Sequence, residues 1–90
     1  MREIPNPITP EHIDSVIKKK TFIRHGKSTL TLCVLDLKNG FTVTGQSACV
    51  DPKVFRVKIG KDMAFEDAKS KVWQLEGYLL QNQMYIDSLL

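Results

Sequence analysis

The spacing of apolar residues near the start of the chain predicts a short amphipathic helix. Ile13 and Val16 are separated by polar residues and recur as they would on one face of a helix. Thr9 is a favourable N-cap, and Pro10 follows at the first helical position, where the absent N–H costs nothing. We therefore expect a helix over residues 10–20.

The residues on either side of this helix complete its expected boundaries. The lysines at 18–20 fall in its last turn, where the helix dipole favours positive charge. Residues 1–8 contain two prolines, which favour extended backbone. We expect an extended arm over 1–8 ahead of the helix.

In the middle of the chain the pattern changes to the two-residue period of strands. Residues 29–37 and 41–48 are rich in β-prone side chains, and Asn39-Gly40 lies between them. Asn-Gly favours a two-residue type I′ turn, because both of its positions need positive φ. The sequence predicts an antiparallel hairpin, with the β-prone segment 21–24 as a candidate third strand.

A two-residue turn also fixes which residues of the hairpin face the core. It pairs Asp36 with Val43 and Val34 with Gly45, and cross-strand partners share a face. One face then carries mainly large apolar side chains, whereas the other is mixed. The expected core face consists of Leu30, Leu32, Val34, Phe41 and Val43.

The C-terminal half of the chain predicts two further helices. Asp51 is a favourable N-cap and Pro52 follows at the first helical position. Gly60 is expected to break the helical pattern, because the apolar residues before and after it fall on opposite sides of one straight helix. We expect a short helix over 52–59, a bend, and a long helix over 63–82.

The long helix carries more apolar surface than one small sheet can cover. Asp67 and Lys71 are spaced for an i,i+4 ion pair on its surface. A second apolar stripe predicts self-association, with coverage by the N-terminal helix or arm as the alternative. The candidate oligomer interface consists of Trp73, Gly77, Leu80 and Met84.

The length predicts one domain, 1–90. The order of the expected elements predicts an α+β fold. It consists of an N-terminal helix, an antiparallel sheet of two or three strands, a short helix and a long C-terminal helix. The apolar content of 42% and the charged content of 26% are typical of folded soluble proteins. No apolar run of about 18 residues is present, so we expect no membrane-spanning segment. The N-terminus has no apolar signal region, which predicts a cytoplasmic protein.

Few side chains are placed for catalysis or metal binding. Cys33, Cys49, His12 and His25 have no paired spacing such as C-x-x-C. The string HGKST resembles the end of a phosphate-binding loop, but it lacks the first glycine and precedes a strand rather than a helix. We expect free thiols, no metal, no cofactor and no enzymatic activity.

Positive charge is concentrated in the middle of the chain. Residues 15–35 and 53–61 contain bases and no acids, whereas both ends are acidic. If the two basic segments lie together in the fold, they would attract the phosphates of nucleic acid or a nucleotide, or an acidic protein surface. The alternative is a solvated basic face without a ligand. Only Phe22 and Phe55 are interleaved with these bases, so no base-stacking platform is expected. The candidate patch residues are Lys18, Lys19, Lys20, Arg24, Lys27, Lys53, Arg56, Lys58 and Lys61.

Two long strings, TLTLCVLDLKNGFTVTGQSACVDPKVF and IGKDMAFEDAKSKVWQLEGYLL, resemble the gene-49/gene-66 family of small tailed-phage proteins. The resemblance covers residues 28–80 and leaves 1–27, with most of the first basic cluster, outside. It implies a phage-encoded protein that acts in the cytoplasm of the bacterial host. It supplies no catalytic or binding residues.

Three binding roles follow from these observations. Small size, the lack of a catalytic constellation and the phage resemblance favour a non-enzymatic accessory protein that binds a host factor during host takeover or counter-defence. The basic segments support an alternative role in binding nucleic acid or a phosphate-bearing nucleotide. The apolar stripe supports a third role in assembly as a homo-oligomer. The run Gly45–Cys49 is either part of a site or scaffold only.

Overall fold

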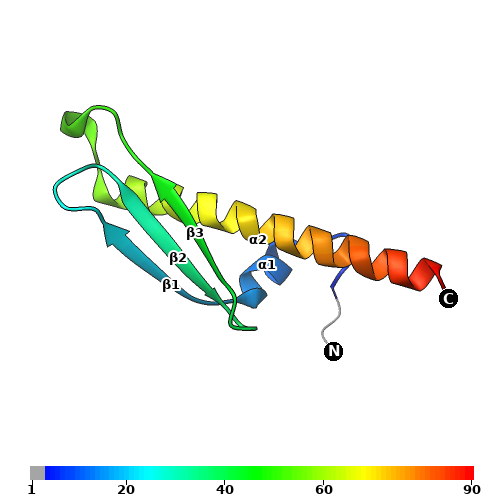
Figure 1. Ribbon diagram of the computed structural model, residues 1–90. Helices are drawn as coiled ribbons and strands as arrows, with labels where there is room; N and C mark the ends of the chain where they lie inside the picture. The colour runs from blue at the N-terminus through cyan, green and yellow to red at the C-terminus, as the bar shows by residue number, and fades with distance from the viewer. Residues whose placement is uncertain (1–3) are drawn as a thin grey trace.

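The computed structural model describes residues 4–90 and confirms the α+β architecture. A three-stranded antiparallel sheet in the order β1-β2-β3 is covered on one face by a long helix, α2 (Figure 1). Of the expected arm 1–8, residues 1–3 lie outside the described residues. The elements are α1 (Pro10–Val16), β1 (Ile17–Arg24), β2 (Thr31–Leu37), β3 (Thr42–Ser47), the 3₁₀ turn η1 (Pro52–Val54) and α2 (Val57–Ser88).

Helix α1 begins as expected but ends four residues early. The Thr9 side chain accepts a hydrogen bond from the His12 amide at 3.2 Å, which confirms the N-cap. At Ile17 the backbone becomes extended, and the three lysines at 18–20 lie in β1 rather than in a last helical turn. Pairing of the whole segment with β2 outweighs the helix propensity of lysine.

The hairpin has a three-residue loop, so the predicted type I′ turn is wrong. Gly40 has φ +93°, whereas no non-glycine residue within 4–90 has positive φ. The Gly40 amide donates to the Leu37 carbonyl at 2.9 Å, and the Leu37 amide donates to the Phe41 carbonyl at 2.8 Å. The Asn39 side chain accepts from the Phe41 amide at 3.0 Å instead of entering the left-handed region.

The change of loop shifts the strand register by one residue and exchanges the two faces of β2, while β3 keeps Val43 in the core. Leu35 pairs with Val43, and Cys33 pairs with Gly45. Because side chains alternate along a strand, the shift puts Cys33, Leu35 and Leu37 in the core. Leu30, Leu32 and Val34, which were expected there, are only half-buried. Phe41, expected in the core, is 55% exposed, whereas Val43 is buried as expected. The observed core consists of Ile13, Val16, Cys33, Leu35, Leu37, Val43, Ala64, Ala68 and Val72.

The outer edge of β3 is capped by side chains of α2. The Asp67 carboxylate accepts from the Gln46 amide at 2.8 Å, and the Lys71 ammonium donates to the Thr44 carbonyl. The predicted ion pair between Asp67 and Lys71 is therefore wrong, because each charge instead satisfies a backbone group of the edge strand. These two contacts occupy backbone groups that another strand would need for pairing at this edge.

Helix α2 approaches β3 so closely that Gly45 has no space for a side chain. A Cβ at this position would overlap the backbone of Ala64 and Ala68.

The predicted break at Gly60 is wrong, because α2 runs through it without interruption. Gly60 is buried, and a Cβ there would lie 2.9 Å from the Thr31 hydroxyl. Packing against the sheet thus compensates for the low helix propensity of glycine, and the helix expected over 52–59 is reduced to η1.

Helix α1 contacts both the sheet and α2. The carbonyl of Val16 accepts from the Lys38 amide in the hairpin loop at 3.0 Å, and Ile13 is fully buried. The His12 Nε2 atom lies 2.8 Å from Glu76 Oε1, and both side chains are nearly buried. This polar contact joins the N-terminal helix to the middle of α2.

The molecule is elongated, with principal extents of 58 × 21 × 18 Å, because the C-terminal part of α2 continues past the sheet (Figure 1). None of the helices in residues 4–90 combines the length and the apolar character needed to cross a membrane.

The substitution Gly45→Ala is expected to lower the free energy of unfolding by about 1–3 kcal/mol or more, because its methyl group forces α2 away from β3. Gly77→Ala is the matched control, because its Cβ would meet nothing within 4 Å. Removing this helix-interior glycine should stabilise the protein by roughly 0.5–1 kcal/mol. Urea unfolding followed by circular dichroism measures both changes. A Gly45→Ala protein as stable as the wild type contradicts the close contact.

Candidate functional site

Cationic and aromatic side chains alternate along the edge strand β1. Lys20, Phe22 and Arg24 are two residues apart and therefore project from the same face of the sheet. Lys20 pairs with Leu35, and Phe22 pairs with Cys33, both of which belong to the buried face. The three side chains consequently lie on the face that α2 covers, at the side of the sheet away from β3.

Each of these β1 side chains forms a cation–ring contact with a side chain from the start of α2 or the turn before it. The Lys20 ammonium lies 4.5 Å from the centroid of the Phe65 ring, and the Arg24 guanidinium lies 4.5 Å from that of Phe55. The Lys61 ammonium lies 5.6 Å from the centroid of Phe22. A cation over a ring face at such distances is attracted by the ring quadrupole, by about 0.5–1 kcal/mol at exposed sites.

A fourth cation extends this row toward the middle of α2. The Lys69 ammonium lies 4.9 Å from the centroid of Phe65, on which Lys20 also lies. All three rings in the row are half-buried, so part of each stays accessible. We call this row the cation–aromatic stripe; its members are Lys20, Phe22, Arg24, Phe55, Lys61, Phe65 and Lys69.

The two ends of the stripe differ in charge. At one end, Lys69 lies 3.5 Å from an Asp14 carboxylate oxygen and 4.0 Å from one of Glu66. At the other end, the Arg24 Nε atom donates to the Ser28 carbonyl at 3.0 Å. This carbonyl is neutral, so the contact does not compensate the positive charge of Arg24. The Arg24 end is therefore the more attractive to an anion.

The structure joins part of the predicted basic patch. Lys20, Arg24 and Lys61 come together in the stripe although they belong to the two separate basic segments. Lys19 pairs with Asp36 and so projects from the opposite face of the sheet. The remaining predicted patch residues are exposed and make none of the aromatic contacts: Lys18, Lys27, Lys53, Arg56 and Lys58, of which Lys58 forms an ion pair with Asp62 at 2.9 Å.

Sequence reasoning missed two members of the stripe, Phe65 and Lys69. Their spacing contained a signal, because Lys61, Phe65 and Lys69 recur every four residues along one helix face. The pairing of these residues with β1 could not be read from the sequence, because the lysines of β1 were assigned to a helix.

The run Gly45–Cys49 is mostly explained as scaffold. Besides the contact at Gly45 and the capped amide of Gln46, the Thr29 hydroxyl donates to the Cys49 carbonyl at 2.6 Å and accepts from the Cys49 amide at 3.0 Å. Ser47 and Cys49 also line a cleft of about 220 Å³ beside the start of α2. The walls of this cleft include the stripe residue Phe55.

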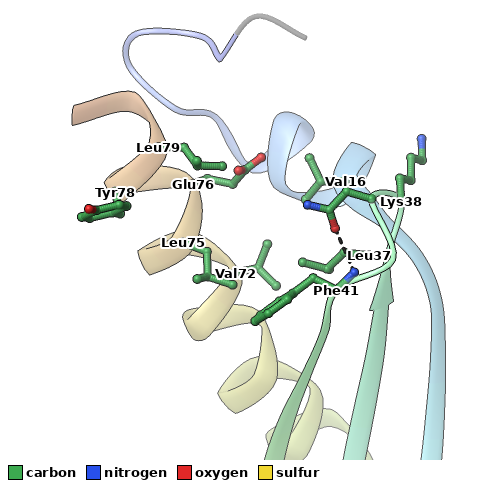
Figure 2. A pocket seen from close by; sticks show the side chains of 10 residues that line it. Val16, Leu37, Lys38, Phe41, Val72, Leu75, Glu76, Tyr78 and Leu79 are labelled. Atoms are coloured by element: carbon green, nitrogen blue, oxygen red, sulfur yellow. Dashed lines mark hydrogen bonds between the residues drawn. The ribbon is translucent and has the colours of Figure 1, made fainter. Parts of the chain in front are cut away.

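A second cleft, of about 210 Å³, lies at the hairpin-loop end of the sheet (Figure 2). Leu37 and Phe41 from the hairpin face Val72, Leu75 and Leu79 of α2 across it. Its walls are mainly apolar, which suits an apolar side chain rather than a charged ligand.

The residues of the predicted oligomer interface have different environments. Trp73 is half-buried and packs against the core, and Gly77 and Leu80 are also half-buried. Met84 is 47% exposed. Part of this stripe is thus used inside the protomer, and self-association through it stays a prediction.

The residues first considered for metal binding or nucleophilic chemistry lie on different elements. His12 contacts Glu76, whereas His25 lies in the loop between β1 and β2. Both cysteines are free thiols, as expected. Cys33 is fully buried, and this burial raises the pKa of its thiol, an effect that the nearby Lys20 charge partly opposes.

Comparison with known proteins identifies one family. The model of the phage protein (N4 Gp49/phage Sf6 gene 66) family matches residues 8–84. The match therefore includes the basic residues of β1, which the resemblance over 28–80 had left outside. No curated protein and no solved structure matches the chain.

The two thiols are expected to differ strongly in reactivity. Cys33 should react at least about 100-fold more slowly than Cys49 with an aromatic disulfide reagent near neutral pH, because it is buried and its raised pKa disfavours the thiolate. Labelling rates of the Cys33→Ser and Cys49→Ser variants, followed by mass spectrometry, measure the two sites separately. Equal rates in the folded protein contradict the burial of Cys33.

Proposed function

The chain belongs to the phage protein (N4 Gp49/phage Sf6 gene 66) family, and from this premise we propose that it is a phage accessory protein that binds single-stranded nucleic acid, without catalysis, in the cytoplasm of the bacterial host. The cation–aromatic stripe carries the proposal. It fits the second of the binding roles expected from the sequence.

The arrangement of the stripe suits a polyanion with flat bases. Lys20 and Arg24 are four residues apart in an extended strand, so their backbone positions are about 13 Å apart, and Lys61 lies beside the ring between them. Cations spaced along a strand follow a phosphate backbone, while the accessible parts of the adjoining rings can contact the bases. The structure brings in a third ring, Phe65, so the rings accompany the cations along the whole stripe.

Single strands fit this surface better than duplex DNA. The rings are half-buried in a narrow row between a strand and a helix, where an unpaired base can reach them. Asp14 and Glu66 lie beside Lys69 at one end of the stripe, where they would repel the phosphates of a broad duplex.

A second candidate function is binding of a host protein at the η1 end of the molecule. Val54, Val57, Ile59 and Met63 are 61%, 48%, 55% and 59% exposed, and three of them line the cleft of about 220 Å³. Exposed apolar residues gathered around a cleft are typical of protein-binding surfaces. This surface supports the host-takeover or counter-defence role expected from the sequence.

Binding of a fluorescent oligothymidine, measured by anisotropy over a range of salt concentrations, tests the primary proposal. The double variant Lys20→Ala/Arg24→Ala should bind more weakly, and the magnitude of its log–log salt slope should fall by roughly 0.7 for each phosphate that the protein no longer neutralises. The control is Lys19→Ala, which removes one positive charge, against two in the double variant, from the same strand on the opposite sheet face. Its binding should change much less.

Equally weakened binding by the Lys20→Ala/Arg24→Ala and Lys19→Ala proteins contradicts recognition by the stripe and leaves only general charge attraction. Absence of binding by the wild type at low salt rejects the nucleic-acid function. In that case, capture of a host protein that withstands nuclease and is abolished in an Ile59→Asp variant supports the second candidate.

A further inference from the structure

The C-terminal part of α2 carries apolar side chains that the protomer does not cover. The helix contains 32 residues and is therefore about 48 Å long, so its C-terminal part extends beyond the sheet (Figure 1). Every residue from 81 to 90 is exposed. Leu79 and Ile86 are 43% and 44% exposed, and Leu89 is 67% exposed.

These exposed residues continue a heptad pattern that begins inside the fold. The spacing alternates between three and four residues, as at the a and d positions of a coiled coil. The first two members already pack within the protomer: Val72 is fully buried, and Leu75 is half-buried against the core. We call this row the heptad seam; it consists of Val72, Leu75, Leu79, Asn82, Ile86 and Leu89.

We propose that the heptad seam binds a second copy of this chain in an antiparallel two-helix arrangement. A two-fold axis between residues 80 and 81 brings Leu79 opposite Asn82 of the second copy, and Leu75 opposite its Ile86. The same axis places Leu89 of the second copy at the level of Val72, the first residue of the seam. Leu75, Leu79, Asn82 and Ile86 then face one another across the axis, and Leu89 of the second copy reaches the cleft beside the buried Val72.

The charges of this segment favour a second copy over a different partner. Among residues 77–90, Asp87 is the only charged side chain. Such a surface neither repels its own copy nor selects a strongly acidic or basic partner. Asn82 supplies one polar position in the seam, a feature that fixes register and orientation in paired helices.

The apolar cleft of Figure 2 lies where the second copy ends. From the proposed axis, Leu89 of the second copy lies about 13 Å along the helix, at the level of Val72. There the cleft of about 210 Å³ opens between Phe41 and Leu75. Its apolar walls and the 55% exposure of Phe41 suit insertion of the terminal leucines of the second copy.

Pairing also accounts for a helical end that has no support in the isolated protomer. A helical segment of about a dozen residues without packing is only marginally stable in water. The stripe of Trp73, Gly77, Leu80 and Met84 occupies other heptad positions, so the two candidate interfaces can be separated by experiment.

Sedimentation equilibrium of the full chain over a range of concentrations tests the proposal. The wild type should approach twice the 10.2 kDa protomer mass. Ile86→Asp should weaken self-association at least about 100-fold, because each dimer carries the change twice. The matched control, Met84→Asp, changes a residue of similar exposure outside the seam and should leave the dimer intact.

Disulfide trapping then tests the orientation, on a Cys49→Ser background with diamide as the oxidant. A mixture of Phe41→Cys and Leu89→Cys proteins should form a covalent heterodimer, while Leu89→Cys alone should not cross-link, because an antiparallel pair holds the two copies of residue 89 about 25 Å apart. A monomeric wild type, a dimer unaffected by Ile86→Asp, or efficient cross-linking of Leu89→Cys alone overturns the proposal. Dissociation of the dimer in Met84→Asp with retention in Ile86→Asp assigns the interface to the Trp73 stripe instead.

Discussion

The close contact between α2 and β3 at Gly45 is the constraint on which the rest of the structure depends. Because Gly45 has no side chain, the backbones at Ala64 and Ala68 lie directly against the strand. At this short distance Asp67 and Lys71 reach the outer edge of β3 and satisfy its backbone groups. Two backbone groups at the β3 edge are thereby satisfied by α2, while β1 forms the other edge of the sheet.

The position of α2 creates the two surfaces for which binding roles are proposed. Since the helix lies against β3, its opposite flank faces the β1 side of the sheet, where Lys61 and Phe65 meet Phe22 and Lys20. Beyond the hairpin loop the same helix leaves the sheet and exposes the heptad seam. A single long helix thus both completes the cation–aromatic stripe and carries the heptad seam, for which pairing is proposed. Both surfaces are consequences of how one helix is placed on a small sheet.

The sequence was sufficient to predict the elements of the fold but not their exact relation. The cap at Thr9, the hairpin around Asn39-Gly40 and the long C-terminal helix could be predicted because each depends on neighbouring residues. The loop at Asn39 has three residues instead of two, and this local difference exchanged the faces of β2, whereas Val43 of β3 stays in the core. Lys20 was assigned to a helix because the partner that extends its backbone, β2, is remote in the sequence. Lys20, Arg24 and Lys61 of the predicted basic patch lie together in the stripe, and their role in binding stays a prediction. Phe65 entered the site only through contacts that spacing alone does not show.

Hydrogen–deuterium exchange along α2, measured at low and high protein concentration, tests most directly whether this one helix has two roles. The amides of residues 60–76 should be protected equally at both concentrations, because they pack on the sheet within each protomer. The amides of residues 79–88 should exchange rapidly in dilute protein and become protected in concentrated protein, as the second copy binds. Uniform protection along the whole helix at every concentration would contradict the account.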